Sequence, residues 1–141
     1  MQEKDIGMLI KQLYDAKEKR ANEQLKEFEL TFSQFRLLIY VRERDGKAVP
    51  LKEIERHFFL TQQTVAGIMK RLEEKGFVSS CEDTSDKRVK NVFLTEKGEE
   101  SCRNAMDCYQ RSQELLTRGL SQKEQQELSR LLTVVLGNMK L

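Results

Sequence analysis

Proline, histidine, cysteine and tryptophan are scarce in this 141-residue sequence, which has one proline, one histidine, three cysteines and no tryptophan. Because proline interrupts helices, its scarcity favours long helices. The lone His57 cannot build a zinc site, and no cysteine lies at finger-like spacing from it. The odd number of cysteines, without a CxxC pair, argues against a disulfide framework. We therefore expect no metal, no cofactor and reduced thiols.

Long apolar runs and an excess of one charge sign are also missing. No run approaches the roughly 20 residues that span a bilayer, and the first five residues lack the pattern of a secretory signal. We expect a cytoplasmic protein that does not bind a membrane. The net charge of +2 neither requires nor excludes a nucleic acid partner. No nucleophile elbow, phosphate-binding glycine loop or metal-ligand cluster occurs, so we do not expect an enzyme.

Helical periodicity dominates the first third of the chain. Residues 5–28 carry a narrow apolar stripe, which predicts a helix that packs on one partner surface. Thr31 and Gln34 form a capping box at the start of a second helix, which should end near Asp45-Gly46. We place Pro50 at the first position of a short third helix, where its missing N–H costs nothing.

Residues 51–76 have the pattern of a helix, a tight turn and a second helix. Thr61 is a suitable N-cap for that second helix, which should end at Lys75-Gly76. The period then changes, because residues 77–81 and 89–94 are rich in β-branched and aromatic side chains. With a polar turn between them, these two segments predict a β-hairpin that leans on the preceding helices.

Two more helices are expected after the hairpin, capped by Thr95 and by a Ser121–Glu124 capping box. The predicted order is α-α-α-α-β-β-α-α, a mainly α protein with a small β-hairpin wing. We expect an N-terminal dimerisation helix (1–30), a winged helix-turn-helix DNA-binding head (31–98) and C-terminal dimerisation helices (99–141).

The helix-turn-helix is the main functional motif. Its second helix normally presents exposed residues to base edges in the major groove. Glutamine can bond bidentately to adenine, and lysine and arginine can contact phosphates. An ordinary helical hairpin with a solvated polar face would show the same pattern. The candidate DNA contacts on this helix are Thr61, Gln62, Gln63, Thr64, Ala66, Gly67, Lys70, Arg71 and Lys75.

The polar turn of the predicted hairpin favours DNA binding over an ordinary helical hairpin. Lys87, Arg88 and Lys90 lie along it, and a basic tip suits a narrow minor groove, where the negative potential is strongest. Asp86 could pair with Arg88 and fix the shape of the tip. Alone, this segment would be interpreted as a solvated turn with an idle salt bridge. Directly after a recognition-type helix, it is better interpreted as a wing.

Several of these segments together resemble the MarR (multiple antibiotic resistance regulator) family over about residues 30–100. Leu30-Thr31 with Gln34 and Leu37-Leu38 resembles the second helix of that family, and the stretch from Thr64-Val65 to Phe77-Val78 resembles its recognition helix and wing entry. Two further segments of this chain are similar to the wing signature of that family and to the start of its fifth helix. These segments are Asp83 with Asp86-Lys87-Arg88, and Leu94-Thr95-Glu96-Lys97-Gly98.

The resemblance implies a homodimer whose terminal helices intertwine, bound to a pseudo-palindromic operator and usually acting as a repressor. It implies release by a small ligand or by oxidation, and it makes Asp86 and Arg88 the wing pair, with Arg88 in the minor groove. The sequence departs from the family pattern at Ser80, where an arginine is frequent, and at Ala66-Gly67. These departures leave fewer cationic donors for DNA.

The terminal apolar stripes support dimerisation independently, because a head of about 70 residues could not cover them. In the resembled family, effectors lie between the dimerisation helices and the head. An arginine beside aromatic rings could receive an anionic aromatic ligand, although such residues more often form plain core. The candidate lining residues here are Tyr14, Phe35, Arg36, Tyr40, Met106 and Tyr109.

Two alternatives remain open. One is a thiol-based redox regulator that uses Cys81, Cys102 or Cys108, although Glu82 and Asp83 next to Cys81 disfavour a reactive thiolate. The other is a winged-helix protein-binding module, because fold does not dictate function.

Overall fold

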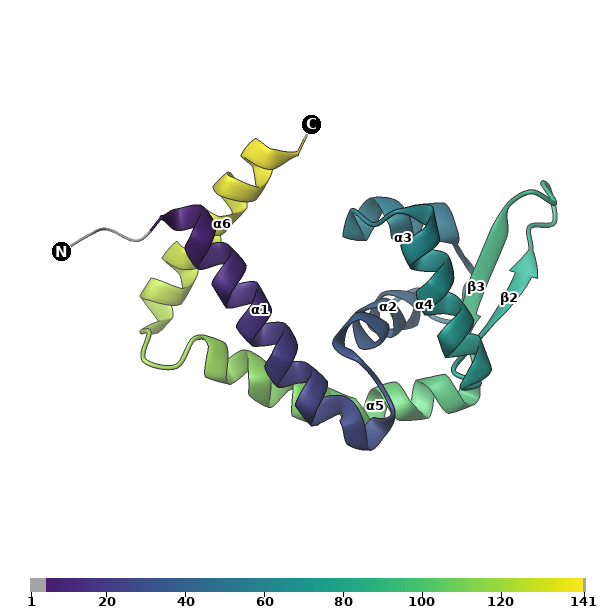
Figure 1. The fold of residues 1–141 in the computed structure, drawn as a ribbon, viewed down its shortest axis with the longest axis horizontal. Coiled ribbons are helices and arrows are strands. Elements are labelled where there is room, and N and C mark those ends of the chain that lie inside the picture. Colours follow the sequence, from purple (N-terminus) through teal and green to yellow (C-terminus); the bar gives the residue numbers. More distant parts are fainter. Residues whose placement is uncertain (1–4, 141) are drawn as a thin grey trace. The chain divides into compact units, whose positions relative to one another are not determined.

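A computed structural model describes residues 5–140 and divides the chain into two compact units, the first ending at Cys108 and the second beginning at Tyr109. The helices of the first unit are α1 (Ile6–Leu25), the short 3₁₀-helix η1 (Lys26–Phe28), α2 (Phe32–Arg42), α3 (Leu51–Phe58) and α4 (Gln62–Glu74). Its strands are β1 (Val49–Pro50), β2 (Val78–Glu82) and β3 (Lys90–Leu94). Helix α5 (Glu96–Leu116) runs from the first unit into the second, which also contains α6 (Gln122–Met139). The predicted mainly α fold with a β-hairpin wing is confirmed (Figure 1).

Side-chain caps fix several of the helix starts. The Thr31 hydroxyl accepts a hydrogen bond from the Gln34 amide at 3.1 Å, and the Gln34 side chain accepts one from the Thr31 amide at 3.2 Å. Ser121 and Glu124 form the same reciprocal pair at the start of α6. The Thr61 hydroxyl caps α4 by accepting from the Thr64 amide. These caps were predicted, because each satisfies backbone N–H groups that a helix start leaves unpaired.

The sheet has three strands in the order β1-β3-β2, all antiparallel. The hairpin of β2 and β3 was predicted, whereas β1 was not. Pro50 was expected to open α3, but it pairs with Asn91 in β1 and is the N-cap of α3, which begins at Leu51. A two-residue strand is too short to show a period, and proline fits there because β1 is an edge strand that needs no further N–H donor.

The core of the first unit lies between α2, α3, α4 and the sheet. Phe35 and Leu38 of α2, Ile54 of α3 and Val65 and Leu72 of α4 are each completely buried. Full burial of side chains of this size stabilises a fold by about 1.5–3 kcal/mol each. The predicted inner faces of α2 and α4 are therefore confirmed, and the orientation of α4 is fixed by its buried stripe.

The start of α5 is joined closely to the end of α4 and the start of β2. The Thr95 hydroxyl donates to the Gly76 carbonyl at 2.6 Å, and the Thr95 amide donates to the Phe77 carbonyl at 3.1 Å. Gly98 is buried here, and a Cβ added to it would lie 2.0 Å from the Phe77 carbonyl oxygen. Only glycine allows α5 to lie this close to the Phe77 carbonyl, and this close packing explains why residue 98 is glycine.

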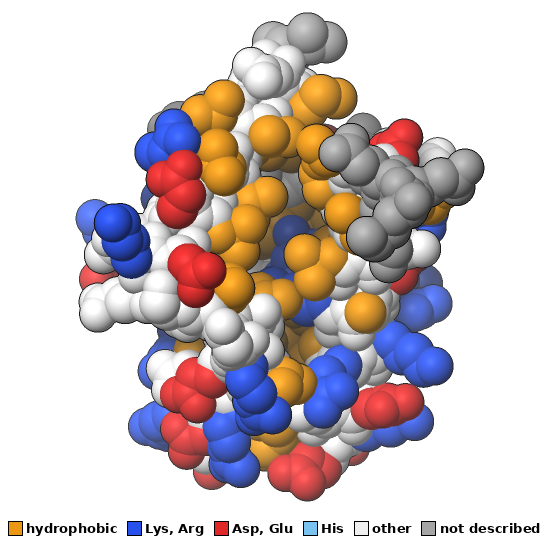
Figure 2. Space-filling view, turned by 90° about the vertical axis from the view of Figure 1, so that its left-hand side faces the viewer, with side chains coloured by type: hydrophobic (Ala, Val, Ile, Leu, Met, Phe, Trp, Pro, Cys, Tyr) orange, Lys and Arg blue, Asp and Glu red, His pale blue; other side chains and the backbone are white. Residues whose placement is uncertain are grey.

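Large hydrophobic side chains are exposed on the helices outside this core. Within residues 5–140, all of them except Phe59 lie on α1, α5 or α6, and many are open to view in Figure 2. Helix α6 has no buried residue, although its stripe includes Leu131, Leu132 and Val135. Within the described part of the chain, no helix combines the length and apolar character needed to cross a membrane.

Candidate nucleic-acid interface

Helix α4 presents a polar face opposite its buried stripe. Gln63, Gly67 and Lys70 are exposed and are separated by three or four residues, so they share one side of the helix. Gln62 and Ala66 are exposed on the adjoining side. The buried stripe holds the helix against the head and leaves the opposite face accessible to a partner.

The N-terminal end of α4 carries two threonine hydroxyls next to each other. The Oγ1 atoms of Thr61 and Thr64 are 2.9 Å apart and hydrogen bonded, and both side chains are exposed. Exposed hydroxyls at a helix N-terminus, where backbone N–H groups point outward, suit contact with a phosphate. Arg71 lies on the same side of the helix as Thr64 and is also exposed.

Lys75 was predicted as a phosphate contact, but the structure gives its side chain partners inside the head. Its ammonium donates to the Glu29 carbonyl and, at 2.9 Å, to the Gln34 side-chain oxygen. Lys75 is only partly exposed. We therefore do not count Lys75 among the candidate phosphate contacts, because its ammonium already has two acceptors within the head.

A groove of about 680 Å³, called the basic groove below, lies between α3, α4 and the wing. Its floor is apolar, with Met69 and Val92 almost fully buried, and the small side chains of Ala66 and Ser80 leave it open. Two acidic residues, Glu55 and Glu73, also line it. The basic residues that line the groove are Lys52, Arg56, Lys70, Arg88 and Lys90.

Lys52 and Arg56 were not among the predicted DNA contacts. Both are exposed on α3, and in the described part of the chain neither forms an ion pair. Their spacing of four residues, beside an inner face formed by Leu51, Ile54 and Phe58, was the available signal. It was missed because the sequence does not show that the wing returns next to α3.

The wing tip is ordered by two carboxylates. Asp86 accepts from the Arg88 guanidinium at 3.1 and 3.2 Å and from its amide at 3.0 Å, so the predicted pair exists. These hydrogen bonds from Arg88 lower the pKa of Asp86. The Arg88 side chain remains 91% exposed, with Lys87 and Lys90 exposed beside it. A bidentate link therefore orients Arg88 while leaving it accessible.

Asp83 is the second of these carboxylates, and it was not among the predicted site residues. One of its oxygens accepts from the amides of Ser85 and Asp86, and the other accepts from the Asn91 side chain at 3.2 Å. Asn91 is buried on β3. Asp83 thus ties the turn to the central strand, a typical arrangement for an aspartate at the start of a turn.

Among the candidate effector residues, the structure brings Tyr14 and Arg36 together. The Arg36 guanidinium donates to the Tyr14 hydroxyl at 3.1 Å and lies over the rings of Phe32 and Phe58, 5.5 and 4.9 Å from their centroids. The Lys17 ammonium lies 5.5 Å from the centroid of Phe32. Burial, and secondly the charge of Arg36, lowers the pKa of Lys17.

The other candidate effector residues are placed differently. Tyr40 belongs to a neighbouring cluster, where it donates to Glu53 at 2.7 Å and stacks on His57 with ring centroids 4.5 Å apart. Phe35 is fully buried in the core. Met106 is half-buried on α5, and Tyr109 belongs to the second unit. One cleft lined by all six residues therefore stays a prediction.

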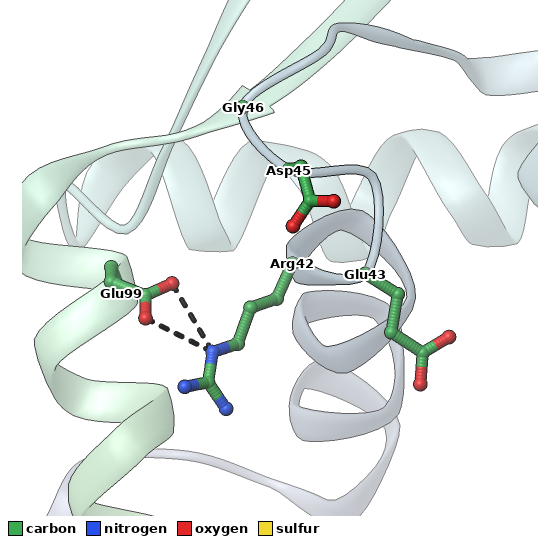
Figure 3. Close-up of a pocket in the computed structure, with 5 residues that line it drawn as sticks. All are labelled: Arg42, Glu43, Asp45, Gly46 and Glu99. Carbon is green, nitrogen blue, oxygen red and sulfur yellow. Dashed lines mark hydrogen bonds and ion pairs between the residues drawn. The ribbon is translucent and has the colours of Figure 1, made fainter.

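A second pocket lies where α2 ends, and the two members of an ion pair line it. Arg42 and Glu99 point toward each other across it, with nitrogen–oxygen distances of 3.0 and 3.2 Å, while Glu43 points away (Figure 3). Burial raises the pKa of the nearby Cys102 thiol to about 11. Cys81 is exposed and Cys108 is half-buried. Cys102 is thus a poor candidate for a reactive thiolate.

Comparison with known proteins places this arrangement in a family. A MarR family model matches residues 28–89, which include α2, α3, α4 and most of the wing. The structure superposes on that of the transcriptional regulator SlyA with a TM-score of 0.88 and 30% identity, covering 96% of this chain and 94% of that one. The chain belongs to the MarR family. The described residues contain no cluster of three or more metal-ligating side chains.

Further relatives in this family support the same placement. An Escherichia coli MarR variant complexed with operator DNA has a TM-score of 0.85 and 27% identity, with 93% of each chain covered. The HTH-type transcriptional regulator TtmR of Methylorubrum extorquens is 38% identical over 84 residues, which are 60% of this chain. The chain spans only 42% of the length of TtmR. These relatives are transcriptional regulators, not enzymes.

Proposed function

We propose that this MarR-family chain is a sequence-specific DNA-binding transcriptional regulator that acts as a homodimer on a pseudo-palindromic operator. The observation that carries the proposal is the joint exposure of the α4 polar face and the ordered wing on two sides of one basic groove. A regulator of transcription works on the chromosome, so the proposal also places the chain in the cytoplasm. The repressor role rests on family resemblance alone.

In this proposal, α4 enters the major groove and the wing tip enters the neighbouring minor groove. Gln62 and Gln63 are the candidate adenine readers, and Arg88 is the candidate minor-groove residue. The DNA strand that separates these two grooves must then pass between α4 and the wing. The basic groove lies there, and Lys52, Arg56 and Lys70, which have no ion-pair partner among residues 5–140, provide cations for the phosphates of that strand.

The proposed dimer interface consists of the exposed apolar stripes of α1, the end of α5 and α6. An 18-residue helix without a buried residue needs a partner surface, because isolated amphipathic helices are marginally stable in water. Residues 31–98 then form the DNA-binding head, and residues 1–30 and 99–141 supply dimerisation. The second half of α1 also serves the head, since Ala21 and Leu25 are buried in the first unit.

Selection of bound sites from random duplex DNA tests the DNA and dimer proposals together. We expect two inverted half-sites with centres about one helical turn apart. Replacing Arg88 or Lys70 should weaken binding and lower the slope of log K against log salt by about 0.9 for each phosphate that the variant no longer neutralises. Failure to enrich any site, with a folded protein that binds a protein partner, would favour the protein-binding module instead. In vitro transcription from the selected site distinguishes repression from activation.

Sedimentation of interface variants tests the dimer separately. Leu132→Asp places a charge in the apolar stripe of α6, whereas Gln126→Asp places one on an exposed polar position of the same helix. We expect the first change to give monomers at micromolar concentration and the second to leave the dimer intact. A dimer that survives both changes would show that the apolar stripe of α6 is not in the interface.

We also propose that an anionic aromatic ligand binds at Lys17 and Arg36. Both cations lie over Phe32, and in the described part of the chain neither is within 4 Å of a carboxylate. The ligand carboxylate would pair with these two cations, and the ligand ring would pack against the exposed ring of Tyr14, because Phe32 itself is buried. In calorimetry we expect heat with benzoate, none with benzyl alcohol, and loss of the benzoate signal in Arg36→Met. Equal heats for the acid and the alcohol would refute this.

A further inference from the structure

Lys70 of α4 and Lys75 at its C-cap look alike in the sequence but have different surroundings. Lys70 is exposed, lines the basic groove and has no ion-pair partner among the described residues. Lys75 caps the C-terminal end of the helix. Five residues at about 100° each place the two side chains roughly 140° apart around the helix axis. They therefore point in different directions from the helix.

The Lys75 ammonium is fixed between the α1–α2 connection and the start of α2. It donates to the backbone carbonyl of Glu29 and to the side-chain oxygen of Gln34, 2.9 Å away. Gln34 is buried and is the capping-box partner of Thr31. The same oxygen thus receives both the Thr31 amide and the Lys75 ammonium, so the link depends on how α2 begins.

The conformation of the connection directs the Glu29 carbonyl. Glu29 follows η1 in a left-handed conformation with φ of +59°, which is uncommon for a residue other than glycine. Such a residue is held in place by its surroundings. A change in the direction in which α1 leaves the head would turn this carbonyl and break or shift its bond to Lys75.

Side chains at the start of α5 bind the backbone carbonyls of the residues that end α4. The Lys97 ammonium donates to the Lys75 carbonyl at 2.8 Å, and the Thr95 hydroxyl donates to the Gly76 carbonyl. The C-terminal end of the recognition helix is therefore bonded to the α1–α2 connection on one side and to the start of α5 on the other. Helices α1 and α5 both contribute to the proposed dimer interface.

We propose that Lys75 is a positioning residue that couples the α1–α2 connection to the orientation of α4, and that it does not contact DNA. This inference rests on the proposed DNA-binding function. Its consequence is that any event that reorients α1, such as dimer rearrangement or ligand binding, reaches the recognition helix through the Lys75 ammonium.

Salt-dependent binding to the selected operator tests the proposal with matched variants. Lys75→Met keeps the aliphatic stem and removes the donors; we expect about fivefold weaker binding at an unchanged salt slope. Lys70→Met should lower the slope by about 0.9. Lys75→Arg should restore binding, because a guanidinium supplies donors for both oxygens. Val41→Ala, which lowers stability by trimming the core, should leave affinity unchanged. A lowered slope in Lys75→Met, or its full wild-type affinity, would overturn the proposal.

Amide hydrogen exchange in the DNA-free protein separates this inference from the proposed function. In Lys75→Met we expect faster exchange both in the last turn of α4 and in residues 26–31, whereas Lys70→Met should change neither. If the wild type bound no DNA, the exchange result would still decide whether Lys75 couples the two segments. Unchanged exchange in Lys75→Met would reject the coupling even if DNA binding were established.

Discussion

Replacement of Gly98 by alanine should destabilise the protein strongly, although it adds one methyl group to a helix. The new Cβ would lie 2.0 Å from the Phe77 carbonyl oxygen and 2.9 Å from its carbon, against the 3.4 Å at which ordinary contacts begin. The first turn of α5 must therefore move by more than 1 Å. Overpacking costs typically about 1–3 kcal/mol, and loss of either hydrogen bond of Thr95 adds about 1 kcal/mol.

We therefore expect a loss of about 3 kcal/mol in the free energy of unfolding, equivalent to a Tm lower by roughly 10 °C. Thermal melts followed by circular dichroism measure this, at a fixed protein concentration because dimerisation would also shift Tm. Gly67→Ala is the matched control, since its Cβ meets nothing within 4 Å and lies inside the exposed face of α4. The free energy of unfolding of Gly67→Ala should rise by about 1 kcal/mol, because alanine has a higher helix propensity than glycine. A Gly98→Ala protein that melts with the wild type would refute the packing argument.

Three further predictions concern the wing, the thiols and the helix-turn-helix. Asp86→Asn should weaken operator binding without lowering the salt slope, because it releases Arg88 but removes no cation; a lower slope in a filter-binding assay would contradict this. Alkylation with iodoacetamide at pH 8 should modify Cys81 rapidly and spare Cys102 in the native protein, since Cys102 is buried and its pKa is about 11. Mass spectrometry of the peptides measures the order of modification, and faster labelling of Cys102 would contradict this prediction. Phe59→Gly should raise the free energy of unfolding by about 1 kcal/mol, because Phe59 has a φ of +54°, which glycine adopts without strain, and its ring is 72% exposed. A denaturant melt in which the variant is less stable than the wild type would mean that the Phe59 ring makes a stabilising contact.

The elements of the fold were predicted well from the sequence because their signals are local. Thr31, Thr61 and Ser121 each cap a helix through bonds to residues three positions away, so the caps are visible in the sequence itself. The apolar periods of α2 and α4 likewise report their buried faces. Strand β1 was missed because its pairing partner, β3, is about forty residues away and two residues show no alternation.

The candidate site was predicted less completely, because its geometry depends on contacts between distant segments. The Asp86–Arg88 pair spans two residues and was anticipated, whereas the Asp83–Asn91 link requires the register of the hairpin. Arg36 and Tyr14 were both predicted to line an effector site and are hydrogen bonded to each other, whereas Lys17 joins them only because α1 packs along α2. Long-range placement, rather than residue type, decides which of these groups meet.

The lysines of α4 show what this means for assigning function. A lysine on a recognition helix is ordinarily counted as a phosphate contact, and both Lys70 and Lys75 satisfy that expectation in the sequence. Only the fold shows that the Lys75 donors are occupied by a backbone carbonyl and a buried amide oxygen. A cation that already has two acceptors within the head has less to gain from a phosphate than Lys70, which forms no ion pair among the described residues. In the proposed complex, the DNA strand in the basic groove would therefore be contacted by Lys52, Arg56 and Lys70, and Lys75 would act on DNA binding through the orientation of the helix.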